Sequence, residues 1–205
     1  MWANTPNDVW AIGPGVSVFN SIWHYDGFRW TTDSIPRAIT PTGIFGFASN
    51  DVWIGTAEGA FWNYNGSSWR EVVKLTLPEY NRIYIENIWG PAPNNIYAVG
   101  FAENTSTNDY KAILLNFNGI KWEFVQIPKI KLSFTNILKQ NSSGLFIINA
   151  YDLAGTDNNN RLIVYNGTDF NEIYVGNSTT EIYNMNNEIY IYRRQGKSLN
   201  IRTIN

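Results

Sequence analysis

One short motif returns along the whole chain at a nearly constant interval. It reads PNDVWAIG at 6–13, SNDVWIGT at 49–56 and PNNIYAVG at 93–100. The aromatic position of this motif, called the aromatic slot below, is occupied by Trp10, Trp53, Tyr97, Phe146 and Tyr190. Successive slots lie 43, 44, 49 and 44 residues apart. A period of about 20–50 residues is typical of solenoids and propellers, whose units bury their apolar faces only against neighbouring units.

A second apolar position precedes each slot by eight residues, at Trp2, Phe45, Trp89, Leu138 and Ile182. Large side chains at the same step of every unit are suited to filling the wedge between stacked sheets. We therefore expect Trp2, Phe45 and Trp89, together with the five slot residues, to form the repeat core. A sugar-stacking platform built from Trp10, Trp53 and Tyr97 is the alternative.

A third landmark follows downstream, as YDGFRW at 25–30, YNGSSW at 64–69, FNGIKW at 117–122 and YNGTDF at 165–170. Asp-Gly or Asn-Gly between strand-like residues predicts a two-residue type I′ hairpin turn. In the third unit, strand-like segments cover 83–90, 94–101, 111–118 and 121–128, and none sustains a helical period. Each unit therefore predicts four short strands.

Four strands per repeat of 43–49 residues predict an all-β fold, a β-propeller of four-stranded antiparallel blades. We expect one domain over 1–205, with about five blades at 1–37, 38–79, 80–129, 130–177 and 178–205. The first and last blades should be incomplete, because the first opens near the end of its innermost strand and the last stops before its outermost strand. We expect a C-terminal part of a longer propeller that lacks its upstream blades; a compact five-bladed ring is the alternative.

Composition excludes several classes of partner. The 17 acidic and 15 basic residues leave a net charge of -2, so no basic excess exists to bind a nucleic acid. Zero cysteines exclude disulfides and Cys-ligated zinc. No apolar run approaches the ~18 residues of a membrane-spanning helix, so we expect no membrane insertion.

Binding is expected in the loops between the second and third strands of each blade. In a propeller these loops share one face with the connections between blades, and here they vary from GPGV and TAEG to AENTSTNDY and YDLAGTDNNN. The residues expected to meet a partner are Asn104, Thr105, Asn108, Asp109, Tyr110, Tyr151, Asp152, Asp157, Arg193 and Arg194. Asp152 and Asp157 are a weak calcium candidate, against which a solvated loop is favoured. We expect no other metal and no cofactor.

Enzymatic chemistry has little support in the sequence. The single histidine, His24, lies among aromatic strand residues, and no cysteine or Gly-x-Ser-x-Gly motif supplies a nucleophile. Glycosidase chemistry needs two facing carboxylates, which sequence alone cannot pair among Glu58, Glu86 and Asp109. Asp8 and Asp51 occupy equivalent turn positions and are expected to bond their local backbone. The sequence thus favours a non-catalytic protein.

PNDVWAIG followed by WHYDGFRW resembles the Trp-rich tandem repeats of bacterial exported β-propellers, loosely grouped as Asp-box, kelch-like or glycosyl-hydrolase-like. The chain departs from a true Asp-box because Asp26 and Gly27 are adjacent, and it lacks the Gly-Gly pair of kelch repeats. The resemblance implies an extracellular, cell-surface or periplasmic protein. We predict a scaffold that binds a protein or glycan through its variable loops; the alternative is a fragment of a carbohydrate-active propeller enzyme.

Overall fold

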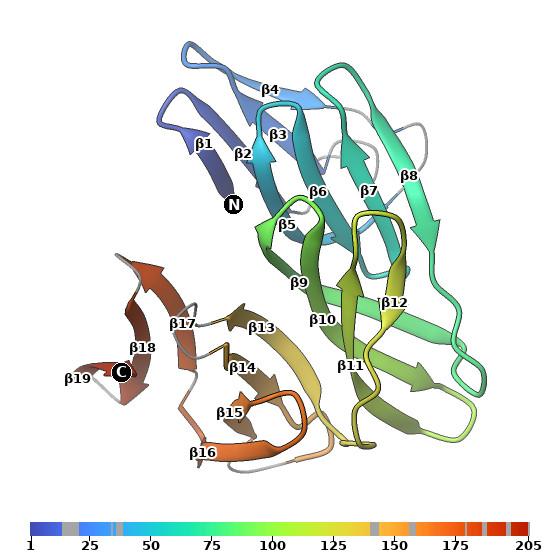
Figure 1. Ribbon diagram of the computed structural model, residues 1–205, viewed down its shortest axis with the longest axis vertical. Coiled ribbons are helices and arrows are strands. Elements are labelled where there is room, and N and C mark those ends of the chain that lie inside the picture. The colour runs from blue at the N-terminus through green and yellow to red at the C-terminus, as the bar shows by residue number, and fades with distance from the viewer. Residues whose placement is uncertain are drawn as a thin grey trace.

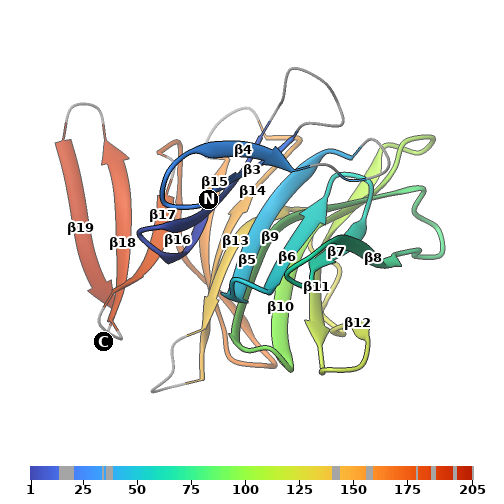
Figure 2. The same ribbon diagram turned by 90° about the horizontal axis from the view of Figure 1, so that it is seen from above.

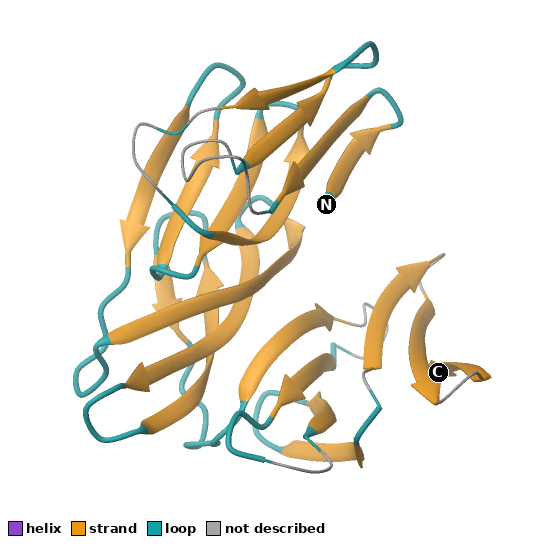
Figure 3. Ribbon diagram, turned by 180° about the vertical axis from the view of Figure 1, so that it is seen from behind, coloured by secondary structure: helices purple, strands orange, loops and turns teal. Residues whose placement is uncertain are grey.

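Strands and loops make up the whole described part of the chain. The computed structural model describes residues 1–13, 21–33, 35, 39–139, 144–155, 159–178, 180–185, 188–195 and 198–204. Figure 3 shows these residues as strands and loops, without a helix. The strands form five antiparallel sheets, four of them with four strands and one with three. The predicted all-β fold with four-stranded repeats is confirmed.

Each sheet takes its strands from one repeat. The first contains β1 (Trp2–Thr5), β2 (Asp8–Ile12), β3 (Ile22–Tyr25) and β4 (Trp30–Asp33). The second contains β5 (Pro41–Ala48), β6 (Asp51–Thr56), β7 (Ala60–Tyr64) and β8 (Trp69–Lys74). The third contains β9 (Arg82–Ala92), β10 (Asn95–Asn104), β11 (Asp109–Phe117) and β12 (Trp122–Phe124). The fourth contains β13 (Ser133–Lys139), β14 (Phe146–Tyr151), β15 (Asn160–Tyr165) and β16 (Phe170–Gly176). The fifth contains β17 (Thr180–Met185), β18 (Glu188–Gln195) and β19 (Ser198–Ile204).

The sheets are arranged as successive blades, numbered one to five below. Within every sheet the strands are neighbours in chain order, and the first strand of each blade contacts the first strand of the next, from β1 through β5, β9 and β13 to β17. Figures 1 and 2 show the blades following one another around this inner row. The innermost strand of blade one, β1, has 4 residues, whereas the innermost strand of blade two, β5, has 8. A Cβ at Gly43 would lie 3.0 Å from the Cα of Asn87, so this glycine lets inner strands of neighbouring blades approach.

The hairpin turns between the third and fourth strands differ from the predicted type I′ geometry. Gly27, Gly66, Gly119 and Gly167 have φ of 92°, 93°, 90° and 102°. The preceding Asp or Asn is not among the described positive-φ residues, whereas type I′ requires positive φ at both central positions. Instead, the Asn65 side-chain oxygen accepts hydrogen bonds from the backbone N–H groups of Ser67 and Ser68, both at 3.0 Å. These turns are Asx-capped loops closed by a left-handed glycine.

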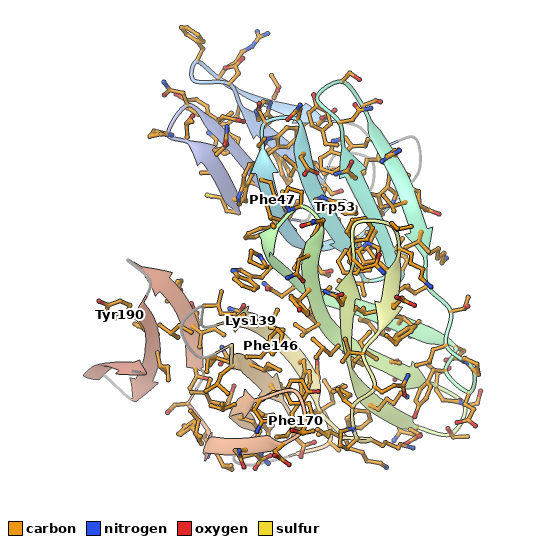
Figure 4. All side chains as sticks on the ribbon, viewed as in Figure 1. Phe47, Trp53, Lys139, Phe146, Phe170 and Tyr190 are labelled. Carbon is orange, nitrogen blue, oxygen red and sulfur yellow. The ribbon has the colours of Figure 1, made fainter. Side chains whose placement is uncertain are left out.

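The side chains at the aromatic slot pack against the following blade, except in blade four. Trp10 and Trp53 are 1% and 5% exposed and belong to clusters shared with the next blade. Their burial removes them as a sugar-stacking platform. Phe146 lies opposite Tyr165, the position that Val52 occupies opposite Tyr64 in blade two. Phe146 therefore points to the preceding blade, blade three, rather than to blade five (Figure 4). The next residue, Ile147, occupies the slot face, because a one-residue shift in register turns a side chain to the opposite side of a sheet.

The residues two positions before the slot hold the second and third strands together through their side chains. Asp8 Oδ1 lies 2.8 Å from His24 Nε2, and the His24 ring stacks on Trp10 at 4.0 Å. Asp51 Oδ1 accepts hydrogen bonds from Asn63 Nδ2 at 2.9 Å and Trp53 Nε1 at 2.8 Å. The expectation of local Asx bonds at Asp8 and Asp51 is therefore wrong, since pairing places a polar side chain of the neighbouring strand opposite each slot. His24 has a structural role.

Candidate functional site

The loops between second and third strands lie on the same face as the connections between blades. Ala57 N donates to Thr40 O at 2.9 Å, and Asn81 N donates to Glu103 O at 3.0 Å, so loop and connection are joined in blades two and three. Figure 2 shows the β10–β11 hairpin on the upper side and the β9–β10 turn on the lower side. This face, which carries the β6–β7, β10–β11 and β14–β15 loops and the β8–β9 and β12–β13 connections, is called the loop face below.

A cavity of about 380 Å³ opens on the loop face between blades two and three. The polar and aromatic residues of its wall are Glu58, Lys74, Thr76, Tyr80, Asn81, Arg82 and Tyr84. These residues come from the β6–β7 loop, the end of β8, the β8–β9 connection and the start of β9. The cavity is therefore assembled where two blades meet, which is a usual place for a ligand site.

Several wall residues are held in place by their neighbours. Glu58 Oε2 accepts a hydrogen bond from Thr40 N at 3.1 Å, which ties it to the connection before blade two. Tyr84 stacks on Phe101 with ring centroids 4.4 Å apart and planes inclined by 11°. Arg82 Nη1 lies 3.4 Å from the Tyr84 hydroxyl oxygen, to which it donates. The side chains of Arg82 and Tyr84 thus lie on the opposite side of β9 from Ile83, whose side chain packs against blade two.

The β10–β11 hairpin is fixed against this wall by side-chain hydrogen bonds. Asn81 Nδ2 donates to Thr105 Oγ1 at 2.9 Å, and Thr105 N donates to Asn81 Oδ1 at 3.1 Å. Asn104 Nδ2 donates to Glu79 O at 2.7 Å. Asn108 adopts φ of 53°, which closes the hairpin tip. The long loop predicted to bind a partner is therefore a preformed part of the cavity rim.

Asp109, at the base of the hairpin, forms ion pairs with lysine side chains. Its carboxylate lies 2.6 Å from Lys129 Nζ and 3.4 Å from Lys131 Nζ, and it accepts a hydrogen bond from the Tyr80 hydroxyl at 3.3 Å. The hydrogen bond from Lys129 holds the pKa of Asp109 below its ordinary value. Lys111 Nζ stands 5.1 Å over the Tyr80 ring. Two lysines thus pair with one carboxylate and a third lysine stands over the neighbouring tyrosine ring, which leaves this part of the rim positive.

The loop of blade four meets the hairpin of blade three through one tyrosine. The Tyr110 hydroxyl donates to Asp152 Oδ1 at 3.0 Å and accepts a hydrogen bond from Ala154 N at 3.2 Å. Burial, and then the hydrogen bond to Asp152, raise the pKa of Tyr110. The Tyr151 hydroxyl accepts a hydrogen bond from Asn159 Nδ2 at 3.0 Å, and Tyr151 is 38% exposed. The loop face therefore continues from blade two to blade four.

The structure brings most of the predicted binding residues onto this face. Asn104, Thr105, Asn108 and Asp109 border the cavity wall, and Tyr110, Tyr151 and Asp152 lie at the blade-four loop. Arg193 and Arg194 lie near the end of β18, and their side chains, like residue Asp157, fall outside the described part of the structure. The binding role of this set stays a prediction.

Sequence reasoning missed the wall residues Lys74, Tyr80, Asn81, Arg82 and Tyr84. They lie at strand ends and in a connection between blades, and these segments have no sequence pattern that separates a binding residue from a scaffold residue. A usable signal was present, because the topology already placed connections on the same face as the variable loops. The segment LPEYNRIY at 77–84 combines charged, amide and aromatic residues there.

Other groups contribute less to a site. Within the described residues, no group of three or more His, Asp or Glu is placed to hold a metal ion. Glu86 lies on the innermost strand of blade three, at a bulge opposite Val99 and Gly100, and burial raises its pKa. No described side chain forms a hydrogen bond or ion pair with Glu86.

A larger cavity of about 590 Å³ lies at the outer rim of blades three and four, lined by Pro128, Ile130 and Phe170 among others. Its polar residues are engaged locally. Thr168 N and Asp169 N donate to Asn166 Oδ1 at 2.9 and 2.8 Å within their own turn. This cavity belongs to the scaffold turn of blade four, so the cavity on the loop face is the better candidate site.

Comparisons with known proteins support the fold. No protein-family model matches the chain, and no curated protein matches it with significant sequence similarity. Among solved structures, the chain is similar to "YCF48 bound to D1 peptide", with a TM-score of 0.51 and 12% sequence identity over 94% of this chain and 73% of that one. At this identity the likeness shows the β-propeller fold alone. Within the described residues, no helix has the length and apolar character that crossing a bilayer requires.

Proposed function

We propose that this chain is a non-catalytic binding propeller that holds a segment of a partner protein on its loop face, over the cavity between blades two and three. The cavity itself carries the proposal. Its volume of about 380 Å³ suits a few side chains of a ligand, and its lining combines the charged residues Glu58 and Lys74 with the aromatic residue Tyr80. Charged and aromatic groups on a rigid frame are typical of peptide-binding surfaces.

The charge of the rim favours an acidic segment. Lys129 and Lys131 pair with the single carboxylate of Asp109, Lys111 stands over the Tyr80 ring, and Lys74 and Arg82 line the neighbouring cavity. Carboxylates of a ligand would meet several cations, whereas a basic segment would be repelled. A glycan is the less favoured ligand, because the buried slot tryptophans Trp10 and Trp53 offer no stacking platform.

A peptide ligand is also in keeping with the solved structure that this chain resembles. That protein is described as bound to D1 peptide. The likeness extends to the fold alone, so it agrees with a peptide ligand for a propeller of this kind and indicates nothing about the sequence of that peptide. Export to the cell surface or periplasm remains part of the proposal, based on the repeat resemblance.

Binding by the full 205-residue chain to an array of short synthetic peptides, graded from acidic to basic, tests the proposal. We expect retention of acidic peptides, and we expect Lys129→Ala to weaken it. Lys121→Ala is the matched control, because Lys121 is likewise exposed and paired with one acid, Glu123, at 2.8 Å, but lies in a turn on the opposite face. Retention of glycans alone from a parallel glycan array, or equal effects of the two substitutions, would contradict the proposal.

A carbohydrate-active propeller is the second candidate, and Glu86 is the observation that favours it. A half-buried carboxyl with a raised pKa is the form that a glycosidase needs as its general acid. Such an enzyme needs a second carboxylate about 5–10 Å away. Hydrolysis of a set of polysaccharides that is lost on Glu86→Gln would favour this candidate, and an unchanged residual rate would exclude Glu86 as the acid.

A further inference from the structure

Aromatic rings of the outermost strand of blade three, β12, fill the outer part of the interface between blades two and three. Trp122 stacks on Phe61 of blade two with ring centroids 3.8 Å apart, and Phe124 packs against the same core. Trp122 pairs with Phe117 and Phe124 pairs with Leu115, and both partners belong to that core. Because paired residues point to the same side of a sheet, both rings of β12 point towards blade two.

The outermost strand of blade four, β16, has a smaller ring and a charged residue at these two positions. Phe170 ends the hairpin motif of blade four as Trp122 ends that of blade three. Glu172 follows two residues later, where blade three has Phe124. Ile163 and Phe170 pack in the core that blades three and four share, and Glu172 pairs with Ile163. The Glu172 side chain therefore points towards blade three.

The ring of Phe170 also receives no stacking partner from the neighbouring blade. Leu114 lies three residues before the end of β11, where Phe61 lies three residues before the end of β7. Among the described residues, the rings that contact Phe170 are Tyr165 at 4.1 Å and Phe134 at 6.0 Å, both from blade four (Figure 4). The interface between blades three and four thus has fewer and smaller rings at its outer part.

The cavity of about 590 Å³ lies at this part of the interface and is called the outer cavity below. Phe170 and Glu172 line it, together with Ile163 and with Pro128 and Ile130 of the β12–β13 connection. Its other lining residues are Thr168, Asp169 and Asn171. Cavities of about 300–1,000 Å³ that combine apolar residues with a few polar groups are typical of small-molecule sites.

The charged residues that line the outer cavity are both acidic. They are Asp169 and Glu172, and no lysine or arginine lines it. Arg161 Nε lies 3.7 Å from Glu172 Oε1, which is too long for a hydrogen bond, and no residue in the described ranges donates a hydrogen bond to Glu172. The two lysines of the β12–β13 connection are paired with Asp109 on the loop face instead. A cationic group of a ligand can therefore reach the Glu172 carboxylate, whose side chain is 47% exposed.

We propose that the outer cavity binds a small aromatic amine, whose ring packs against Phe170 and Ile130 and whose ammonium group pairs with Glu172. The ring occupies the kind of space that Trp122 and Phe124 fill in the preceding interface. The ammonium group meets the carboxylate that stands where blade three has Phe124. No residue lines both this cavity and the cavity on the loop face, so the proposal does not depend on the proposed function.

Titration of the full chain with phenethylamine, followed by amide NMR, tests this proposal. We expect chemical-shift changes at residues 168–172 and 129–131, which locate the ligand in the outer cavity. Phenylpropionate has a similar ring and chain but the opposite charge, so it should leave these amides unchanged. Glu172→Gln keeps the size of the side chain and removes its charge, so the dissociation constant for phenethylamine should rise about tenfold.

Glu172→Phe gives the sharper result, because it places in blade four the residue type that blade three has at Phe124. It should abolish binding of phenethylamine. Glu71→Phe is the matched control, because Glu71 has the same position on β8 and pairs with Trp62, which faces blade one. It should bind like the wild type, and far-UV circular dichroism establishes that each variant is folded.

The proposal is overturned if phenethylamine shifts none of these amides, or shifts only amides of the loop face. Binding of phenylpropionate with equal affinity overturns it as well. So does an affinity for phenethylamine that Glu172→Gln leaves unchanged, and this variant decides the question if Glu172→Phe does not fold.

Discussion

Replacing Phe61 by alanine probes the packing between blades two and three most directly. Phe61 is fully buried on β7, and its ring lies 3.8 Å from the Trp122 ring with the planes 4° apart. The substitution removes a buried ring and leaves a cavity, which typically costs about 3–5 kcal/mol. Because Trp122 stays largely in place on β12, we expect little collapse of the cavity and a loss of about 4 kcal/mol in the free energy of unfolding.

Urea unfolding followed by tryptophan fluorescence measures this loss. Phe28→Ala is the control, since Phe28 is 94% exposed and its removal should change stability by less than about 0.5 kcal/mol. The urea dependence of the free energy must be compared as well, because repeat proteins can unfold blade by blade. A loss below about 1 kcal/mol for Phe61→Ala with an unchanged urea dependence would refute the proposed inter-blade packing.

The stacked pair itself can be separated from simple burial. In a double-mutant cycle of Phe61→Leu and Trp122→Leu, the coupling should be about 0.5–1.5 kcal/mol, as for other aromatic pairs. Additive effects of the two substitutions would mean that the stacking contributes nothing beyond buried area.

Three further expectations concern β9, β10 and the cavity rim. Gly100→Ala should destabilise the protein by about 3 kcal/mol in urea unfolding, because the added Cβ would clash with the backbone oxygen of Tyr84, while Gly13→Ala, where the Cβ meets nothing, should have little effect. Burial raises the pKa of Glu86, so the stability that its protonated carboxyl contributes is present below the ordinary pKa of 4.5 and is lost as pH rises through the pKa of the folded state. Glu86→Gln should therefore raise the urea midpoint of unfolding at neutral pH, and the difference between variant and wild type should disappear in acid. NMR titration should find the pKa of Asp109 below 3.8, and Lys129→Ala should raise it towards that value, since the hydrogen bond from Lys129 is the main cause of the shift.

The candidate site was predictable only in part. The variable loops at Asn104–Asp109 and Tyr151–Asp152 were expected on one face, and the structure places them there. The wall residues Tyr80 and Arg82 were not expected, because a connection between blades has no periodic pattern from which burial or exposure can be read. Asp109 could not be assigned its partners either, since Lys129 belongs to a different connection, 20 residues further along the chain.

The repeat unit, the five sheets and the positions of the hairpin turns could all be predicted from the amino-acid sequence. They follow from local chemistry, because alternating apolar residues favour strands and a left-handed glycine closes a turn whatever surrounds it. The face to which each side chain points, and the contacts between residues far apart in the chain, depend on how the sheets pack in three dimensions. Phe146 shows why, since a shift of one residue in strand register moved it from one inter-blade core to the other. The exposure of Trp30, which pairs with Tyr25 in blade one, likewise stands out only when it is compared with the buried tryptophans of the corresponding Tyr64–Trp69 and Phe117–Trp122 pairs.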